Sequence, residues 1–481
     1  MFKVEGINDL QTLANVVDGK LLSSNESFSG ITVDSREVSD GAVYIGLQGE
    51  SFDGNLFCDD AINNGCIAVI TNDDQLLGRN ILVEDTYDAL LKIANYHHKQ
   101  INPMTIAITG SNGKTTVKEM IGRILDEEKT VITNKNENNE FGIPYTILRC
   151  TPNTKTLILE CGARHDGDFK KITENFAFDQ LIITNINNSH VGKFGSIDNI
   201  IRTKLELIGA VKESGIVIEA AFKDLSVNRD LNTDSLSINL YITNDSKELD
   251  LQRTWPYLVE SDPDQDRKYS ISLGADKNEL KIIHETAIEH NCINAVITSL
   301  ALEQIGNDIS ESMKRLSGFE NPLKNRFHIH EVANYLVIDD TYNANPTSMQ
   351  SAMKNINDWN DERGRIVILG DMYDLGNHSS GEHKKVINYA LRMKKLRKLI
   401  LVGDKFKNEI KEFSELEREK IIQIQNRVDD FPLLELTRDS STKSKGVVHR
   451  YFKSDGGIIL IKGSRAMKME RFTESIIKYL Q

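Results

Sequence analysis

The sequence has few cysteines, no long apolar run and no excess of positive charge. Its five cysteines are scattered and form no Cys-x-x-Cys pair, which argues against a disulfide framework or a zinc site. Apolar runs such as 399–402 are far too short to cross a membrane. The first residues show no basic segment followed by an apolar one, so we expect no signal peptide. These absences favour a reduced, cytoplasmic protein without membrane insertion.

The formal net charge is -13, which argues against a nucleic-acid or anionic-membrane surface. Anionic small substrates remain compatible with this charge, since local Lys, Arg and helix N-termini can hold them. At about 150 residues per domain, the 481 residues indicate three domains. No exposed apolar stripe is evident, so we expect a monomer.

The segment 106–120 carries the strongest signal in the chain. A short apolar run leads into Gly-x-x-Gly-Lys-Thr-Thr at 110–116, and an amphipathic helical pattern follows. Gly110 and Gly113 allow a tight turn whose N–H groups can point at phosphate oxygens. Lys114 can reach terminal phosphates, and Thr115 can offer a hydroxyl to Mg²⁺. The order of strand, turn, Lys-Thr and helix favours a phosphate-binding loop over an ordinary strand-to-helix turn, although Ile108 replaces the first Gly of the longer motif.

Apolar runs alternate with helical patterns from residue 105 onward, which predicts βαβ units and a parallel sheet. We expect a strand at 105–109, a helix at 115–128, and strands at 156–160 and 181–185. Asn102-Pro103 and a stretch near 318–322 are candidate boundaries. A second α/β region follows, with strands predicted at 335–339, 365–369, 398–402 and 457–461. The polar stretch 220–285 is compatible with loops and edge strands.

Polar residues follow several of these strands, at the edge where ligands of open parallel sheets bind. Glu160 ends one strand, Asn185 ends another, and His190 follows shortly after it. A carboxylate and an imidazole near a triphosphate are reasonable Mg²⁺ ligands. The simpler alternatives are an ion pair for Glu160 and an exposed loop position for His190. Lys204, judged on spacing alone, is a solvated helix residue.

Two clusters of polar residues in the last third of the chain also follow predicted strands. The run 339–346 sets two carboxylates, a Tyr and two Asn after an apolar strand, which predicts a ligand site. The run 461–465 supplies Lys462 and Arg465 on a flexible turn and suits an anionic substrate or product. The alternative for both is an ordinary turn whose polar groups form hydrogen bonds within the protein.

Taken together, these motifs resemble the Mur ligases, ATP-dependent amide-bond formers of peptidoglycan synthesis. The resemblance covers all three parts of the chain. Its blocks are 109–116, 138–144, 184–196 with Lys204, 290–295, 339–346, 370–372 and 462–465. The last three blocks resemble the branch that adds D-alanyl-D-alanine to UDP-N-acetylmuramoyl-tripeptide, and the Asp-Asn-Pro-Arg signature of the branch adding the third amino acid is absent.

The resemblance implies an α/β fold of three domains. These are a small α/β domain at 1–102 for the UDP substrate, a central P-loop domain with a mostly parallel sheet at 103–318, and a Rossmann-like α/β domain at 319–481. The third domain would bind the incoming amine substrate and close on ATP. The implied cofactors are ATP and Mg²⁺, and the implied product is the pentapeptide precursor with ADP and phosphate.

The resemblance also implies residue roles. The catalytic set is Lys114, Glu160, His190 and Lys204, with Lys204 matching a lysine that is carbamylated in these enzymes. Metal ligands would be Thr115, Glu160 and His190. The nucleotide would contact Gly110, Ser111, Asn112, Gly113, Lys114, Thr115, Thr116, Asn291, Asn294, Arg326 and Asp340. Ser35 and Arg36 match a site for the UDP end, and further substrate contacts are assigned to Asn343, Asn345, Lys462 and Arg465.

The sequence departs from the family pattern at several points. Arg164 stands where Asn is expected, the loop before His190 lacks its usual Gly, and 220–285 matches poorly. Three alternatives stay open. One is a ligase of this architecture with another acceptor carboxylate or amine, another is a P-loop kinase or ATPase that forms no amide, and the last is a noncatalytic nucleotide-binding protein. The third residue of the acceptor peptide and the residues that recognise D-alanyl-D-alanine are not assigned.

Overall fold

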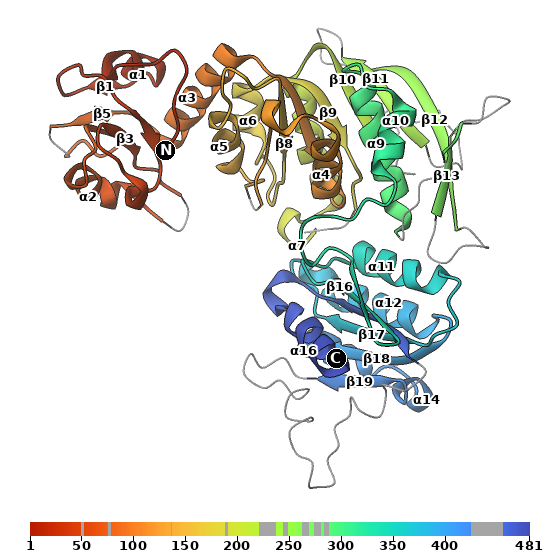
Figure 1. Ribbon diagram of the computed structural model, residues 1–481. Coiled ribbons are helices and arrows are strands. Elements are labelled where there is room, and N and C mark those ends of the chain that lie inside the picture. The colour runs from red at the N-terminus through yellow and green to blue at the C-terminus, as the bar shows by residue number, and fades with distance from the viewer. Residues whose placement is uncertain are drawn as a thin grey trace.

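The computed structural model describes residues 1–49, 52–75, 78–135, 137–187, 191–220, 237–243, 249–261, 269–273, 280–282, 288–424 and 456–481. The described strands form three mostly parallel sheets, which follow one another along the chain from red through green to blue in Figure 1. Helices flank the sheets, so the predicted α/β class is confirmed. No helix in these ranges is both long and apolar enough to cross a membrane.

The first sheet has the strand order β1-β5-β4-β3-β2, and only the β1–β5 pair is antiparallel. Its strands are β1 (Lys20–Leu21), β2 (Gly30–Thr32), β3 (Ala42–Ile45), β4 (Ala68–Thr71) and β5 (Asn80–Leu82). Its helices are α1 (Leu10–Val16) and α2 (Cys58–Asn63). The long helix α3 (Thr86–Ile101) connects this sheet to the central one (Figure 1). It ends at Asn102, whose left-handed backbone precedes Pro103.

The central sheet has the order β14-β13-β12-β11-β10-β9-β6-β8-β7, with a parallel half from β7 to β10. The parallel strands are β6 (Met104–Thr109), β7 (Thr130–Ile132), β8 (Thr156–Glu160), β9 (Phe178–Ile183) and β10 (Val211–Ala220). The antiparallel extension comprises β11 (Ser237–Thr243), β12 (Leu249–Ser261), β13 (Tyr269–Leu273) and β14 (Leu280–Ile282). This extension includes the edge strands expected within 220–285, and the rest of that stretch lies outside the described residues.

Helices cover the central sheet. They are α4 (Lys114–Ile124), α5 (Gly142–Leu148), α6 (Lys170–Asn175), α7 (Val191–Phe194), α8 (Ile197–Glu206), α9 (Glu289–Glu303) and α10 (Ile309–Leu316). Helix α4 stops four residues before the predicted end at 128. Leu125 is extended, and the side chain of Asp126 caps a separate short turn that begins at Glu127. The periodic pattern did not detect this competing cap.

The third sheet has the order β15-β16-β20-β17-β18-β19, with only β15 antiparallel. Its strands are β15 (His328–Val332), β16 (Tyr335–Asp340), β17 (Arg365–Gly370), β18 (Leu396–Val402), β19 (Ile421–Ile424) and β20 (Gly457–Lys462). Its helices are α11 (Pro346–Asp358), α12 (Ser379–Leu391), α13 (Asp404–Ile410), α14 (Glu415–Arg418) and α16 (Glu470–Leu480). The four predicted strands of this region match β16, β17, β18 and β20 to within two residues.

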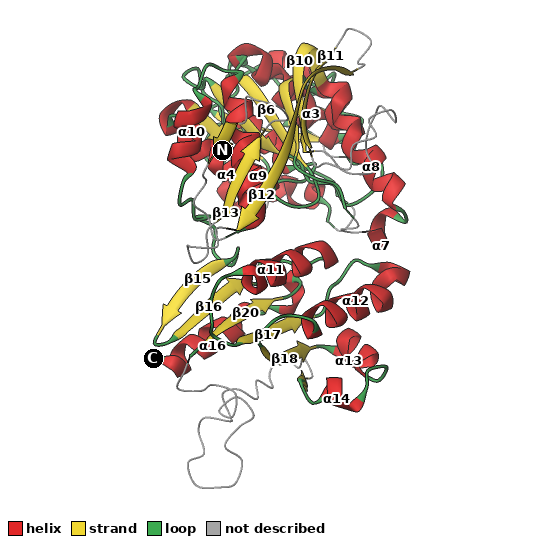
Figure 2. Cartoon of the chain, turned by 90° about the vertical axis from the view of Figure 1, so that its right-hand side faces the viewer, coloured by secondary structure: helices red, strands yellow, loops and turns green. Residues whose placement is uncertain are grey.

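The central and third parts meet directly, as Figure 2 shows with α7 and α11 at their junction. The backbone amide of Gly192 in α7 donates to the carbonyl of Asp374 at 3.0 Å. Gly192 and Gly376 lie face to face, and a Cβ on Gly192 would come within 2.3 Å of the Gly376 nitrogen. The side chain of Asn345 donates to Asn112 Oδ1 at 2.8 Å. The carboxyl ends of strands from both sheets therefore face the same space.

Candidate active site

A cleft of about 1410 Å³ lies at this junction and extends toward the first sheet. The first sheet region contributes Gln48, Gly49, Phe52 and Asn72 to its walls. The central part contributes the whole loop 110–116 together with Glu160, Lys204, Asn291 and Asn294. The third part contributes Arg326, Asp340, Asn343, Asn345 and Lys462. Residues from distant parts of the sequence thus share one cleft.

The loop between β6 and α4 takes the form predicted for a phosphate-binding turn. Gly110 has φ +142°, and a Cβ there would come within 2.1 Å of Thr184 Oγ1. Gly113 has φ +85° and precedes the first turn of α4, whose amides have no acceptor within the helix. The amide of Asn112 donates to Asn185 Oδ1 at 2.8 Å, which ties the loop to the residues after β9. The loop is therefore held in a shape that only glycine permits at two points.

Two lysines converge on this loop. Lys114 Nζ donates to the carbonyl of Gly110 at 2.7 Å, and Lys204 Nζ donates to the same carbonyl at 3.2 Å. Burial lowers the pKa of Lys114, and the charge of Glu160 partly offsets that effect. Burial also lowers the pKa of Lys204 to well below its ordinary value, and the charge of Lys114 lowers it further. Lys204, expected from spacing alone to be solvated, is only 4% exposed.

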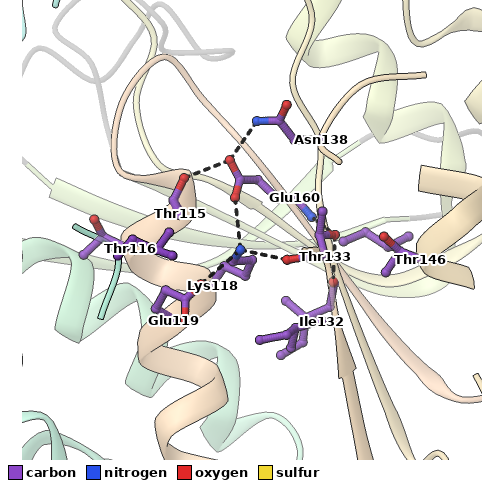
Figure 3. Close-up of polar contacts among 12 residues, drawn as sticks. Thr115, Thr116, Lys118, Glu119, Ile132, Thr133, Asn138, Thr146 and Glu160 are labelled. Carbon is purple, nitrogen blue, oxygen red and sulfur yellow. Dashed lines mark hydrogen bonds and ion pairs between the residues drawn. The ribbon is translucent and has the colours of Figure 1, made fainter. Parts of the chain in front are cut away.

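Glu160 lies at the end of β8 and faces α4 (Figure 3). Its Oε1 accepts hydrogen bonds from Thr115 Oγ1 and Asn138 Nδ2, both at 2.9 Å. Its Oε2 lies 3.6 Å from Lys118 Nζ. Burial acts to raise the pKa of Glu160, but Lys114, Lys118 and the Asn138 hydrogen bond outweigh it, so the pKa lies below its usual value. The site therefore holds a buried carboxylate in its ionised form.

Helix α9 places two buried asparagines beside the loop. Asn291 and Asn294 are each 4% exposed and line the cleft. Asn294 Oδ1 lies so close to Gly113 that a Cβ at Gly113 would come within 3.0 Å of it. Within the described part of the chain, no atom accepts a hydrogen bond from Asn294 Nδ2. A buried donor of this kind is suited to a polar ligand.

The third part supplies a cation and an ion pair between a buried lysine and a partly buried carboxylate. Arg326 Nη2 donates to Thr115 Oγ1 at 3.0 Å, and the guanidinium lies 4.0 Å from the centre of the Tyr342 ring. Lys462 Nζ lies 2.6 Å from Asp340 Oδ2 and donates to the carbonyl of Asn343 at 3.0 Å. Burial raises the pKa of Asp340, and the charge of Lys462 only partly offsets the effect. Charged groups of both signs thus line the same cleft as the predicted phosphate-binding loop 110–116.

Comparison with known proteins identifies the family. Successive parts of the chain match the Mur ligase family catalytic domain at residues 27–104, the Mur ligase middle domain at 108–302, and the Mur ligase glutamate ligase domain at 325–442. The chain belongs to the Mur ligase family. The enzyme class predicted from the sequence, an ATP-dependent ligase, is thereby confirmed.

The similar proteins described below align with nearly the whole of this Mur ligase. The UDP-N-acetylmuramoyl-tripeptide–D-alanyl-D-alanine ligase of Haemophilus influenzae is 29% identical over 95% of this chain and 96% of its own. A crystal structure of MurF from Acinetobacter baumannii has a TM-score of 0.78 at 24% identity, covering 97% and 98% of the two chains. MurF ligase from Thermotoga maritima in complex with ADP has a TM-score of 0.73 at 23% identity, covering 94% and 97%. The two structures establish a shared three-part fold.

The cleft brings together most residues predicted from the sequence of this Mur ligase. Within the described part of the chain, three predicted residues are not among those that line it. Ser35 and Arg36 lie in the first part, where Arg36 is exposed and forms an ion pair of 2.6 Å with Asp34. Arg465 is exposed and pairs with Glu470 at 3.2 Å. His190 lies outside the described residues. The roles of all the predicted site residues, these four included, stay predictions.

Sequence reasoning missed Lys118 and gave no role to Asn138 or Tyr342. Lys118 is only 1% exposed and contacts Glu160, which makes it part of the site's electrostatics. Its position four residues after Lys114 on the same helix, among buried Val117 and Met120, was the available signal. Arg164, which departs from the family pattern, does line the cleft.

Proposed function

We propose that this Mur ligase joins D-alanyl-D-alanine to UDP-N-acetylmuramoyl-tripeptide in the cytoplasm, with ATP as the energy source. One observation carries the proposal. The phosphate-type loop and Glu160 face Arg326, Asp340 and Lys462 in one cleft, in a chain that matches ligases of this name over nearly its full length. The cleft is large enough to admit more than one substrate.

The chemistry follows from the poor reactivity of a carboxylate. Transfer of the γ-phosphoryl group of ATP to the terminal carboxylate of the tripeptide gives an acyl phosphate and ADP. The amine of D-alanyl-D-alanine attacks the acyl carbon, phosphate leaves, and the nitrogen loses a proton to form the amide. Lys114, whose ammonium lies at the Gly110 carbonyl of the loop, stabilises charge on the phosphoryl oxygens in this proposal. Holding three substrates in line contributes roughly 7–11 kcal/mol of barrier lowering.

We assign the nucleotide to the loop side of the cleft. Its phosphates lie on the amides of 110–116 and on Lys114, and its base contacts Asn291 and Asn294. The unpaired donor of Asn294 supports the base assignment, since a buried amide needs an acceptor. Arg326 and Asp340 bind the ribose and the nucleotide from the third part. The Thermotoga maritima relative in complex with ADP agrees with a nucleotide in this fold.

The donors present fit Mg²⁺. Thr115 Oγ1 and Glu160 Oε1 lie 2.9 Å apart and belong to cleft-lining residues, and such hard oxygen atoms are its preferred ligands. Among the described residues no cluster of three His, Cys, Asp or Glu side chains is suited to a metal. Nucleotide phosphates and His190 would complete the coordination, as is usual for Mg²⁺. Bound there, Mg²⁺ supplies charge stabilisation at the transferred phosphoryl group.

Lys204 is assigned as a carbamylated lysine. Its ammonium is buried beside Lys114, where a second cation is unfavourable and a carboxylate-like group is favourable. The ammonium first loses a proton, the neutral nitrogen then bonds to the carbon of CO₂, and a second proton leaves, so two protons are released and the charge changes from positive to negative. The resulting anion would lie beside the ammonium of Lys114, since both lysine side chains reach the Gly110 carbonyl.

The remaining substrates are assigned by part. Residues 1–102 bind the UDP end through Ser35 and Arg36, and residues 103–318 hold the nucleotide. Residues 319–481 bind D-alanyl-D-alanine through Asn343, Asn345, Lys462 and Arg465. Both asparagines already make contacts within the protein. Asn345 caps α11, and Asn343 Oδ1 accepts a hydrogen bond from the Arg465 amide at 3.4 Å.

The test measures phosphate release with ATP and Mg²⁺, adding UDP-N-acetylmuramoyl-tripeptide and D-alanyl-D-alanine separately and together. Release only with both substrates, and formation of the pentapeptide product, is the expected result. Release with another acceptor or amine, but not with this pair, would retain the ligase chemistry and reject the substrate assignment. Release that is independent of any amine would reject ligation.

A further inference from the structure

Lys118 occupies a position that the proposed reaction does not use. Its side chain extends from α4 toward the ends of β7 and β8, away from the loop that precedes the helix (Figure 3). Lys118 Nζ donates to the carbonyl of Thr133 at 2.8 Å and lies 3.0 Å from Glu119 Oε1. The Thr133 hydroxyl in turn accepts a hydrogen bond from the backbone amide of Glu160 at 2.9 Å. These contacts hold the ammonium of the buried Lys118 at 3.6 Å from Glu160 Oε2.

The two oxygens of Glu160 have different surroundings. Thr115 and Asn138, which bind Oε1, both line the cleft. Lys118 and Thr133 are absent from the residues that line it, within the described part of the chain. Oε1 therefore lies on the cleft side, and Oε2 is directed inward to the ammonium of Lys118. A cation entering from the cleft meets only one of the two oxygens.

This arrangement bears on which cation the site accepts. Ca²⁺ takes six to eight oxygen ligands and often uses both oxygens of a carboxylate, whereas Mg²⁺ requires a compact octahedron. A carboxylate limited to one oxygen satisfies Mg²⁺ and penalises Ca²⁺. We propose that Lys118 is a positioning residue that holds Oε2 of Glu160, restricts the carboxylate to one metal bond through Oε1, and so favours Mg²⁺ over Ca²⁺. The proposal rests on the proposed function, in which Glu160 is a metal ligand.

The experiment measures ADP affinity of the full-length protein by calorimetry in EDTA, in saturating Mg²⁺ and in saturating Ca²⁺. The preference is the ratio of the ADP dissociation constants in Ca²⁺ and in Mg²⁺. In Lys118→Met, Oε2 is released and the preference falls by about tenfold, the usual scale for loss of a residue behind a metal ligand. Lys118→Arg keeps a cation at this position and retains the preference. Glu119→Gln, which removes the other carboxylate beside Lys118, also retains it.

Folding is checked by thermal melting and by ADP affinity in EDTA, which lacks the metal contribution. If Lys118→Met does not fold, Lys118→Gln replaces it, since the amide can still donate to Thr133 while the charge is gone. A folded neutral variant with the wild-type preference overturns the inference. Equal loss in Lys118→Arg also overturns it, since a cation would then not be the cause.

The two proposals fail in distinguishable ways. Wild-type protein that binds ADP no more tightly in Mg²⁺ than in EDTA contradicts the metal step of the proposed function. Wild-type protein that gains affinity in Mg²⁺ and forms the amide product upholds the proposed function. Under that result, an unchanged preference in the neutral variant rejects only the role of Lys118.

Discussion

Two carboxylates that are each paired with a buried lysine line the cleft from opposite sides, and their pKa values shift in opposite directions. On the central side Lys118 lies 3.6 Å from Glu160, whose pKa is lowered. On the side of the third sheet Lys462 lies 2.6 Å from Asp340, whose pKa is raised. The shorter ion pair thus belongs to the carboxyl group that is less easily ionised.

The difference lies in how far the neighbouring groups offset the effect of burial on each anion. Glu160 has Lys114, Lys118 and the Asn138 amide to oppose the effect of burial. Asp340 has Lys462 as its main stabilising charge, helped by Arg326 and the Phe327 amide, and burial still dominates. At Asp340 these groups do not compensate for desolvation, whereas at Glu160 the two lysines and the Asn138 hydrogen bond do. An ionised carboxylate such as Glu160 suits the proposed role of metal ligand. Asp340 suits a group whose ionised form gains a further hydrogen-bond donor when a ligand binds.

The largest effect is expected from Lys114→Ala. This substitution removes the cation that lowers the pKa of Glu160 most. Ligation falls by about a thousandfold, because charge on the transferred phosphoryl group loses its stabilising partner. The fold is retained, as checked by thermal melting. Pentapeptide formation measures the effect, and exposed Lys129→Ala serves as the control. Normal ligation by a folded Lys114→Ala protein would contradict the mechanism.

Asp340→Asn tests the other pair. The substitution leaves Lys462, which is 3% exposed, as a buried cation without its carboxylate. Loss of one member of a buried pair lowers the free energy of unfolding by about 3 kcal/mol. Denaturant unfolding measures the loss, and the double variant Asp340→Asn/Lys462→Met is expected to recover part of it. A single variant as stable as wild type would mean that Lys462 finds another partner.

The opposite pKa shifts predict opposite pH dependences. The folded pKa of Glu160 lies below its usual value of 4.5, so its contribution to stability is present above that pH and is lost as pH falls. The folded pKa of Asp340 lies above its usual value of 3.8, so its contribution is present below that pH and is lost as pH rises through the folded pKa.

Melting temperatures of wild type, Glu160→Gln and Asp340→Asn, measured from about pH 3 to 7, test this contrast. The gap between wild type and Glu160→Gln should widen as pH rises, and the gap between wild type and Asp340→Asn should narrow. Parallel slopes would show that the two sides of the cleft do not differ in the way proposed.

The smallest effect is expected at Glu219 in β10, a buried carboxyl group away from the cleft. Burial raises its pKa from 4.5 to about 7, and a hydrogen bond from Tyr241 only partly opposes this. Its contribution to stability is present below pH 4.5 and is lost as pH rises through about 7. Glu219→Gln should therefore melt with less pH dependence between about pH 4.5 and 7 than wild type. Identical melting curves would show that Glu219 stays ionised.

Local features of the fold were predictable from the sequence. The strands at 156–160 and 457–461 were predicted almost to the residue, since short buried apolar runs end at polar residues. The loop at 110–116 was predicted from its glycines, whose positive φ angles the structure contains. The end of α4 was predicted four residues too late, because the cap at Asp126 competes with an otherwise helical pattern.

Strand periodicity and glycine placement are local properties, so the sequence by itself determined the α/β class, the phosphate-type loop and the strand ends that carry Glu160 and Asp340. Only the tertiary structure decided which lysines are buried and which oxygen each one contacts. Lys118 reaches Glu160 because α4 packs beside β7 and β8, and Arg326 reaches Thr115 because the third part closes on the central one. Such contacts join residues tens to hundreds of positions apart, and burial sets their strength.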